Sequence, residues 1–300
     1  MLRESPLSTP ELTLNVARGS AGGAPLVLLH GVTRNWRDFS PLLADLAARW
    51  QIFALDFRGH GKSGRGQQYL TVDYVRDAVH LLRDVADEPA VVYGHSLGAM
   101  VAAAAAAELP ERVQALVLED PPWETLGSRI HETSFHSFFE GVRGVVSRGG
   151  TIETMTRAMA DIDVVTPGTA TSVKLGQVRD LAALRVSADS LKMMDPAVLD
   201  PILAGHWLDG YDRDAVLRNV HCPTLLLQAD WSAGGMLADA DAALTEKSIA
   251  NCVRVRFEGV GHLLHWEARE KVLSAVMNFL ESLEGSRAKL TSQSTKENDR

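Results

Sequence analysis

The chain of 300 residues contains little cysteine and no long apolar run. Its two cysteines, Cys222 and Cys252, are too few for a multi-disulfide scaffold and favour a reducing compartment. No apolar stretch reaches the roughly 20 residues that a membrane-spanning helix needs. The first residues, MLRESPLSTPELT, lack the apolar segment of a secretory signal. We therefore expect a cytoplasmic protein without a membrane partner.

Positive charge is also scarce in this sequence. Lys and Arg together number 30 against 38 Asp and Glu, which gives a net charge of −8. Nucleic acids reward clustered basic side chains, so a nucleic-acid partner is not expected. The ten histidines are scattered, and their spacing does not suggest a metal site. We expect a small-molecule substrate and neither a metal nor another cofactor, whereas the oligomeric state is not predicted.

Short apolar segments alternate with amphipathic ones along most of the chain. We expect strands at 11–17, 25–31, 51–56, 90–96, 113–120, 222–230 and 253–262, and helices at 36–50, 71–86, 97–108, 237–248 and 267–283. Such alternation predicts a mostly parallel central sheet with helices on both faces. Binding sites in these sheets form at the carboxyl ends of the strands.

One long segment interrupts this alternation. Residues 123–205 contain helical patterns but no convincing buried strand, so we expect a helical cap inserted after the strand that ends near Asp120. The core then comprises residues 1–122 and 206–285. The polar stretch 286–300 is expected to be disordered.

The sequence GHSLG, residues 94–98, lies between an expected strand and an expected helix. In one interpretation Ser96 caps the helix. In the other it is a nucleophile on a strained turn, where Gly94 and Gly98 leave room that side chains would fill. The strand and helix on either side favour the nucleophile.

A serine nucleophile requires a base, a carboxylate that orients the base, and donors for the oxyanion. His262 follows the last expected strand and is the preferred base, with His265 as a competitor. Three carboxylates are candidates for the acid: Glu119 and Asp120 end one strand, and Asp230 follows another. Strand alternation points Glu119 and Asp120 to opposite sides, so one of them at most faces the site. The backbone N–H groups of Val32 and Leu97 are the expected oxyanion donors.

Taken together, these motifs resemble the α/β-hydrolase superfamily. The matching pieces are HGV (30–32), DFRGHGKS (56–63), GHSLG (94–98) and GVGH (259–262), and the resemblance covers about residues 11–122 and 206–283. It implies the α/β-hydrolase fold and a structural role for residues 56–63. Members of the family often carry the acid at a position that is Ser232 here. Others carry it at the end of the preceding strand, which makes Asp120 the preferred acid, Asp230 the alternative and Glu119 the third choice.

The resemblance implies a serine hydrolase of the carboxylesterase or lactonase type, which cleaves a small to medium, fairly apolar ester through an acyl-enzyme. Phe and Met residues in the expected cap suggest an adaptable apolar pocket, with Trp36 and Trp123 as further candidates for its lining. Two alternatives stay open. GHLLHWE (261–267) is similar to carbon–carbon bond hydrolases of this fold, and some relatives are non-enzymatic ligand receptors.

Overall fold

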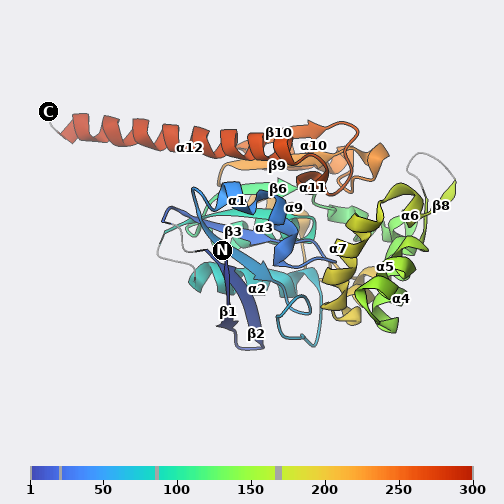
Figure 1. The fold of residues 1–300 in the computed structure, drawn as a ribbon. Coiled ribbons are helices and arrows are strands. Elements are labelled where there is room, and N and C mark those ends of the chain that lie inside the picture. Colours follow the sequence, from blue (N-terminus) through green and yellow to red (C-terminus); the bar gives the residue numbers. More distant parts are fainter. Residues whose placement is uncertain (1, 20–21, 85–87, 166–170, 299–300) are drawn as a thin grey trace.

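The computed structural model describes residues 2–19, 22–84, 88–165 and 171–298 (Figure 1). Its centre is an eight-stranded sheet of order β1-β2-β4-β3-β5-β6-β9-β10. The strands are β1 (Arg3–Ser8), β2 (Thr13–Arg18), β3 (Pro25–Leu29), β4 (Gln51–Asp56), β5 (Ala90–His95), β6 (Val113–Glu119), β9 (Thr224–Ala229) and β10 (Cys252–Phe257). β1 and β2 run antiparallel to their neighbours, and the other pairs are parallel. The predicted mostly parallel sheet is confirmed.

Helices cover both faces of this sheet. They are α1 (Ser40–Leu46), α2 (Thr71–Asp84), α3 (Leu97–Glu108), α9 (Arg213–Arg218), α10 (Asp239–Ser248), α11 (Leu264–Glu267) and α12 (Arg269–Asn298), with the short 3-10 helices η1 (Trp36–Phe39) and η5 (Trp231–Ala233). No helix in the described residues is long and apolar enough to cross a membrane.

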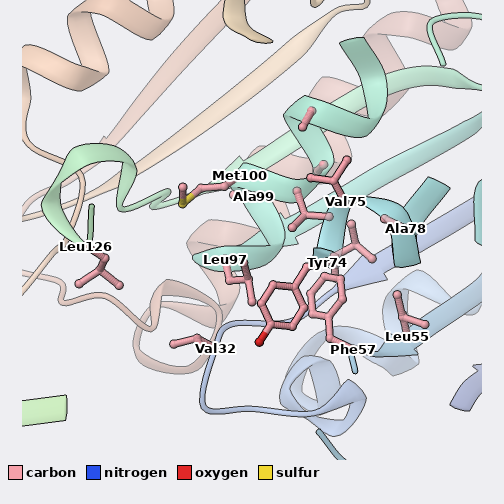
Figure 2. Packing of buried hydrophobic residues seen from close by; sticks show 14 of the residues in the cluster. Val32, Leu55, Phe57, Tyr74, Val75, Ala78, Leu97, Ala99, Met100 and Leu126 are labelled. Carbon is pink, nitrogen blue, oxygen red and sulfur yellow. The ribbon is translucent and has the colours of Figure 1, made fainter. Parts of the chain in front are cut away.

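The central strands are apolar throughout because successive side chains enter two different cores. In β3, Val27 and Leu29 pack with α2 and α3, whereas Leu26 and Leu28 pack with α1 and α12. Figure 2 shows part of the first core, where Leu97 of α3 lies near Tyr74 and Phe57. The start of α3, on which Leu97 stands, is therefore anchored in a packed core.

Two terminal features differ from the sequence expectations. Strand β1 was not expected, because Pro6 and the polar residues of RESPLS weaken the strand pattern; proline is tolerated here since β1 is an edge strand. The disordered tail expected at 286–300 is wrong in its larger part, because α12 continues to Asn298. Extending an existing helix avoids the cost of nucleation, and the segment contains no proline. Residues 299–300 lie outside the described residues.

Residues 123–205 form a helical layer beside one end of the sheet (Figure 1). Its elements are η2 (Trp123–Thr125), η3 (Ile130–Glu132), α4 (Phe135–Arg148), α5 (Ile152–Ala160), β7 (Asp163–Val165), β8 (Ser172–Lys174), α6 (Leu175–Val178), α7 (Leu181–Lys192), η4 (Pro196–Leu199) and α8 (Asp200–Leu203). The short pair β7–β8 was not expected, and it is largely exposed.

This layer contacts the loops that follow β3 and β4. The Arg34 guanidinium donates to the Ser187 hydroxyl at 2.9 Å. The backbone N–H of Asp195 donates to the carbonyl of Gly59 at 2.8 Å. Since both loops leave the carboxyl ends of their strands, the inserted helices lie at the edge of the sheet where a binding site is expected.

Candidate active site

Ser96 lies on a sharp turn between β5 and α3. Its backbone has φ 55° and ψ −118°, and its side chain makes no capping hydrogen bond to α3. Among the described residues, the non-glycine residues with positive φ are Ser96 and Asp120. Strain of this kind persists only where the surrounding structure enforces it, and it clusters at functional sites. The helix-cap interpretation of Ser96 is therefore wrong.

The glycines of GHSLG are required by close backbone contacts. A Cβ on Gly94 would lie 2.1 Å from the carbonyl oxygen of Gly98. A Cβ on Gly98 would lie 1.9 Å from the carbonyl oxygen of Leu29, in the neighbouring strand β3. Neither obstacle is a flexible side chain, so neither can move without distorting the sheet.

We therefore expect Gly98→Ala to destabilise the protein by about 3 kcal/mol or more, as overpacking against buried backbone does. The matched control is Gly22→Ala, because a Cβ at Gly22 meets nothing within 4 Å. That control should change the free energy of unfolding by less than about 0.5 kcal/mol. Urea unfolding of both variants makes the measurement. Equal free energies of unfolding for the two variants would contradict this prediction, because they would show that the turn can accommodate a Cβ at position 98.

His262 and Asp120 are in direct contact. The Nδ1 of His262 lies 2.6 Å from Oδ2 of Asp120. The same carboxylate accepts backbone N–H groups from Ala229 (3.1 Å), Met236 (2.8 Å) and Leu237 (3.3 Å). Asp120 is fully buried, while the His262 side chain is 13% exposed. The Asp120 carboxylate is thus held in place by backbone donors. Its contact with Nδ1 of His262 leaves Nε2 of that ring to accept a proton.

The other two candidate carboxylates have different partners. Asp230 accepts hydrogen bonds from Ser232 and from the backbone N–H of Gly259 (2.8 Å), so it joins the turns after β9 and β10. Glu119 binds Nδ1 of His265 at 2.7 Å. Glu119 and Asp120 therefore serve two different histidines, on opposite sides as strand alternation requires.

His262 is brought to the serine by its neighbour in the elbow. The rings of His262 and His95 lie 4.7 Å apart, and His95 directly precedes Ser96. No hydrogen bond joins the Ser96 hydroxyl to His262 within the described residues, a looseness common before substrate binds. Burial is the largest influence on His262 and lowers its pKa, while the hydrogen bond to Asp120 opposes that shift. The imidazole is therefore neutral, and able to accept a proton, at neutral pH.

The loop after β3 is clamped by two buried histidines. His30 receives the N–H of Phe57 at Nε2 (3.1 Å) and therefore donates from Nδ1 to the Gly31 carbonyl (2.7 Å). His60 holds the carbonyl of Val32 through Nε2. Burial lowers the pKa of both imidazoles, that of His30 to about 3.

The two expected oxyanion donors are unpaired backbone amides. Neither the Val32 N–H nor the Leu97 N–H has an acceptor among the described residues. Both residues are buried, and unpaired buried amides are uncommon. Two such amides beside Ser96 are the groups that a developing oxyanion needs.

A second buried polar cluster lies behind Ser96. It comprises Tyr93, His95, Glu119, Asp38 and His265. The Tyr93 hydroxyl donates to Glu119, and Nε2 of His265 lies 3.3 Å from Oδ2 of Asp38. Burial by itself lowers the pKa of His265, but the charges of Glu119 and Asp38 outweigh it and raise this pKa to about 10. His265 thus belongs to this cluster and not to Asp120.

The two tryptophans expected near the pocket have other contacts. Trp36 donates from its backbone N–H to Asp56 and from its indole to Glu4 of β1. Through these bonds Trp36 joins β1 to the turn at 56–63, and its place in the pocket stays a prediction. Trp123 is fully buried and stacks on Tyr211, with ring centroids 6.5 Å apart.

Sequence reasoning missed His30, His60 and His95. Each makes at least one of its contacts with a residue far away in the chain, and sequence spacing carries no signal for that contact. His30 and His60 do lie within the matched motifs, and a polar ring in an otherwise apolar strand exit was the available clue.

Comparison with known proteins agrees with this architecture. A family model described as "alpha/beta hydrolase fold" matches residues 24–156. The 2-(acetamidomethylene)succinate hydrolase of Mesorhizobium japonicum is 34% identical over 142 residues, which cover 45% of this chain and 50% of that protein. This chain thus matches about half the length of that relative. Epoxide hydrolase A of Mycobacterium tuberculosis is 28% identical over an alignment of 320 residues that covers 93% of this chain and 97% of that protein.

Solved structures extend the match to nearly the whole chain. The crystal structure of E-2-(acetamidomethylene)succinate hydrolase superposes with a TM-score of 0.70 at 24% identity, covering 94% of this chain and 100% of that one. At this identity the likeness concerns the fold alone. Sheet order, elbow, family model and structural match agree, and the chain has the α/β-hydrolase fold.

Proposed function

We propose that this protein is a serine hydrolase that cleaves a carboxylic ester or lactone through an acyl-enzyme. The observation that carries the proposal is the strained serine at the elbow, next to an imidazole held by a buried carboxylate. Ser96 has positive φ, and His262 lies 2.6 Å from Asp120. An unstrained serine without a nearby base would be a weak nucleophile.

In the proposed mechanism His262 accepts the proton of Ser96 as the hydroxyl attacks the substrate carbonyl. Asp120 fixes the tautomer of His262 and stabilises the imidazolium that forms. The N–H groups of Val32 and Leu97 donate to the oxyanion. His262 then protonates the leaving group, and it activates a water molecule that hydrolyses the acyl-enzyme.

Related chemistries are less well supported. Epoxide hydrolases and dehalogenases of this fold carry an aspartate at the elbow, where this chain has Ser96. The resemblance to carbon–carbon hydrolases rested on GHLLHWE, yet His265 and Trp266 contact Glu119 and Asp38 in the cluster behind the elbow. A purely binding role would not require the strain at Ser96 or the two unpaired amides.

The cap formed by residues 123–205 is proposed to select the substrate. Its Phe139, Met155, Met159 and Met194 are buried, so these residues chiefly pack the cap upon itself and the core. We suggest a panel of p-nitrophenyl esters of increasing acyl length, simple lactones, a vinylogous 1,5-diketone and 2-(acetamidomethylene)succinate. Turnover of the esters or lactones supports the proposal. Turnover of the diketone alone, or saturable binding with no turnover, contradicts it.

The pH dependence follows from the lowered pKa of His262. The base must be neutral, so kcat/KM should stay constant above neutral pH and fall as pH drops through a pKa below the ordinary 6.5. The sign follows from burial, which destabilises the imidazolium and extends the neutral form to lower pH. A pH–rate profile with a substrate that does not titrate gives the value. An acidic limb centred above 6.5 would contradict the environment described for His262.

A further inference from the structure

Three buried polar atoms behind the elbow point at one another without a hydrogen-bond partner. They are Oδ2 of Asp38, Nδ1 of His95 and Nε2 of His265. Oδ2 of Asp38 lies 3.3 Å from the His265 nitrogen and 3.5 Å from the His95 nitrogen. All three atoms lie within 4.8 Å of one another. Buried polar atoms are nearly always paired, so three converging exceptions require an explanation.

The tautomers of both histidines follow from their other ring nitrogens. Nε2 of His95 lies 3.1 Å from the carbonyl oxygen of His262, which can only accept, so this nitrogen carries the hydrogen. Nδ1 of His265 lies 2.7 Å from Oε1 of Glu119 and is a donor for the same reason. In the ion-free protein Glu119 and Asp38 keep His265 protonated, so its Nε2–H faces Asp38, whereas neutral His95 presents the lone pair of Nδ1 to the same carboxylate.

Lone pairs facing a carboxylate repel it unless positive charge lies between them. The second proton on His265 satisfies one of the two nitrogens in the ion-free protein. Nδ1 of His95 still faces the same oxygen. One cation placed among the three atoms satisfies both nitrogens and the carboxylate together.

We propose that Asp38, His95 and His265 form a buried site for a divalent cation of the zinc class. A tetrahedral ion with bonds of about 2.0 Å separates its ligands by about 3.3 Å, which agrees with the 3.3 Å and 3.5 Å that separate Oδ2 of Asp38 from the two histidine nitrogens. Two imidazoles and a carboxylate are ligands that Zn²⁺ prefers. The carboxylates of Asp38 and Glu119 carry two negative charges toward such an ion, and the Arg34 guanidinium, 3.6 Å from Oδ1 of Asp38, adds one positive charge beside them.

The surroundings match the outer shell of a metal site. Ligating histidines donate their other N–H to a carboxylate or a backbone carbonyl, as His265 does to Glu119 and His95 does to His262. The second oxygen of Asp38 accepts the indole N–H of Trp266 at 3.0 Å. Asp38 and Trp266 also line a cavity of about 360 Å³ between η1 and α7.

The ion would have a structural role. Asp38 follows the oxyanion loop, His95 precedes Ser96, and His265 lies three residues after His262. One ion would thus join the three segments that carry the donors, the nucleophile and the base. It lies behind the nucleophile, so the proposal does not depend on the substrate or on the ester reaction.

The first experiment uses the native chain without a histidine tag. After incubation with Zn²⁺ and removal of the excess, we expect one zinc per chain and a melting temperature that falls after chelation. Crystals measured above the zinc absorption edge should show an anomalous peak among Asp38, His95 and His265. Less than one zinc per chain, or no anomalous peak at this position, overturns the proposal. The three atoms would then be paired through protons or a buried water molecule.

Variants then locate the zinc. His265→Gln and Asp38→Asn should each lose the bound zinc, with folding checked by circular dichroism. The matched control is the double variant His131→Gln, His136→Gln, which removes a histidine pair in the cap whose rings lie 4.6 Å apart. The control should keep its zinc. Loss of zinc in the control, with retention in a folded His265→Gln, would assign the metal to the cap and overturn the proposal. If the buried variants fail to fold, the anomalous peak in the native chain decides.

Discussion

Ser96→Ala is expected to reduce ester hydrolysis by at least about 10⁴-fold, to the residual rate that substrate binding and the oxyanion donors still supply. The alanine cannot form the acyl-enzyme, and the oxyanion donors and the base then have no nucleophile to assist. Fold and stability should change little, because the Ser96 hydroxyl makes no hydrogen bond within the described residues. Hydrolysis of p-nitrophenyl butyrate gives the rate, and a fluorophosphonate probe gives the site of covalent modification by mass spectrometry.

The matched control for this experiment is Ser128→Ala. Ser128 lies between η2 and η3, and its hydroxyl donates to the Glu124 carboxylate at 2.7 Å. The control should retain full activity and label as the native protein does. If Ser96→Ala hydrolyses the ester at the native rate, or if the probe labels another residue, Ser96 is not the nucleophile and the proposed function fails.

Asp120→Asn is expected to reduce kcat by about 10⁴-fold, as in enzymes where the same exchange disturbs the histidine tautomer. An asparagine that keeps its backbone donors must present an N–H₂ group to Nδ1 of His262 or turn its oxygen there and lose other bonds. The exchange also touches three backbone amides, so some loss of stability should accompany the loss of activity. Activity is therefore measured well below the melting temperature of the variant.

Asp230→Asn is the matched control, since it was the alternative acid. Asp230 is only half-buried and bonds to Gly259 and Ser232, away from His262, so its exchange should leave kcat within a few-fold of the native value. Asp120→Asn and Asp230→Asn together test which of the two carboxylates is the acid. An inactive Asp230→Asn beside an active Asp120→Asn would transfer the role of acid to Asp230 and contradict the geometry described here.

Much of the fold follows from the sequence because the central strands are buried on both faces. A run such as PLVLL at β3 has no polar side to confuse its assignment, and a Gly or Pro marks its end. Strand β1 lacks such a run, since it lies at the sheet edge and contacts only β2 within the sheet. Residues 286–298 carry no apolar pattern, and their helix is an extension of α12 that local composition does not reveal.

Sequence alone predicted a site residue only where a short sequence motif marks that residue's position. Ser96 and His262 follow strands that a short sequence identifies, and alternation separated Glu119 from Asp120. Which of the three carboxylates meets His262 depends on how the turns after β6, β9 and β10 pack together. The cluster of Asp38, His95 and His265 depends on three segments meeting in space, and no spacing in the chain encodes that meeting.

The hydrogen bonds of Asp120 restrict how this protein can change. Its carboxylate accepts three backbone N–H groups from the segment after β9 as well as contacting His262. Moving the acid to position 232, where relatives often carry it, would leave those three buried donors without an acceptor. Each such orphan costs about 1–3 kcal/mol, a large part of a typical domain's stability. Evolution from one arrangement to the other therefore requires a new conformation of the turn after β9 before the acid can change its position in the chain.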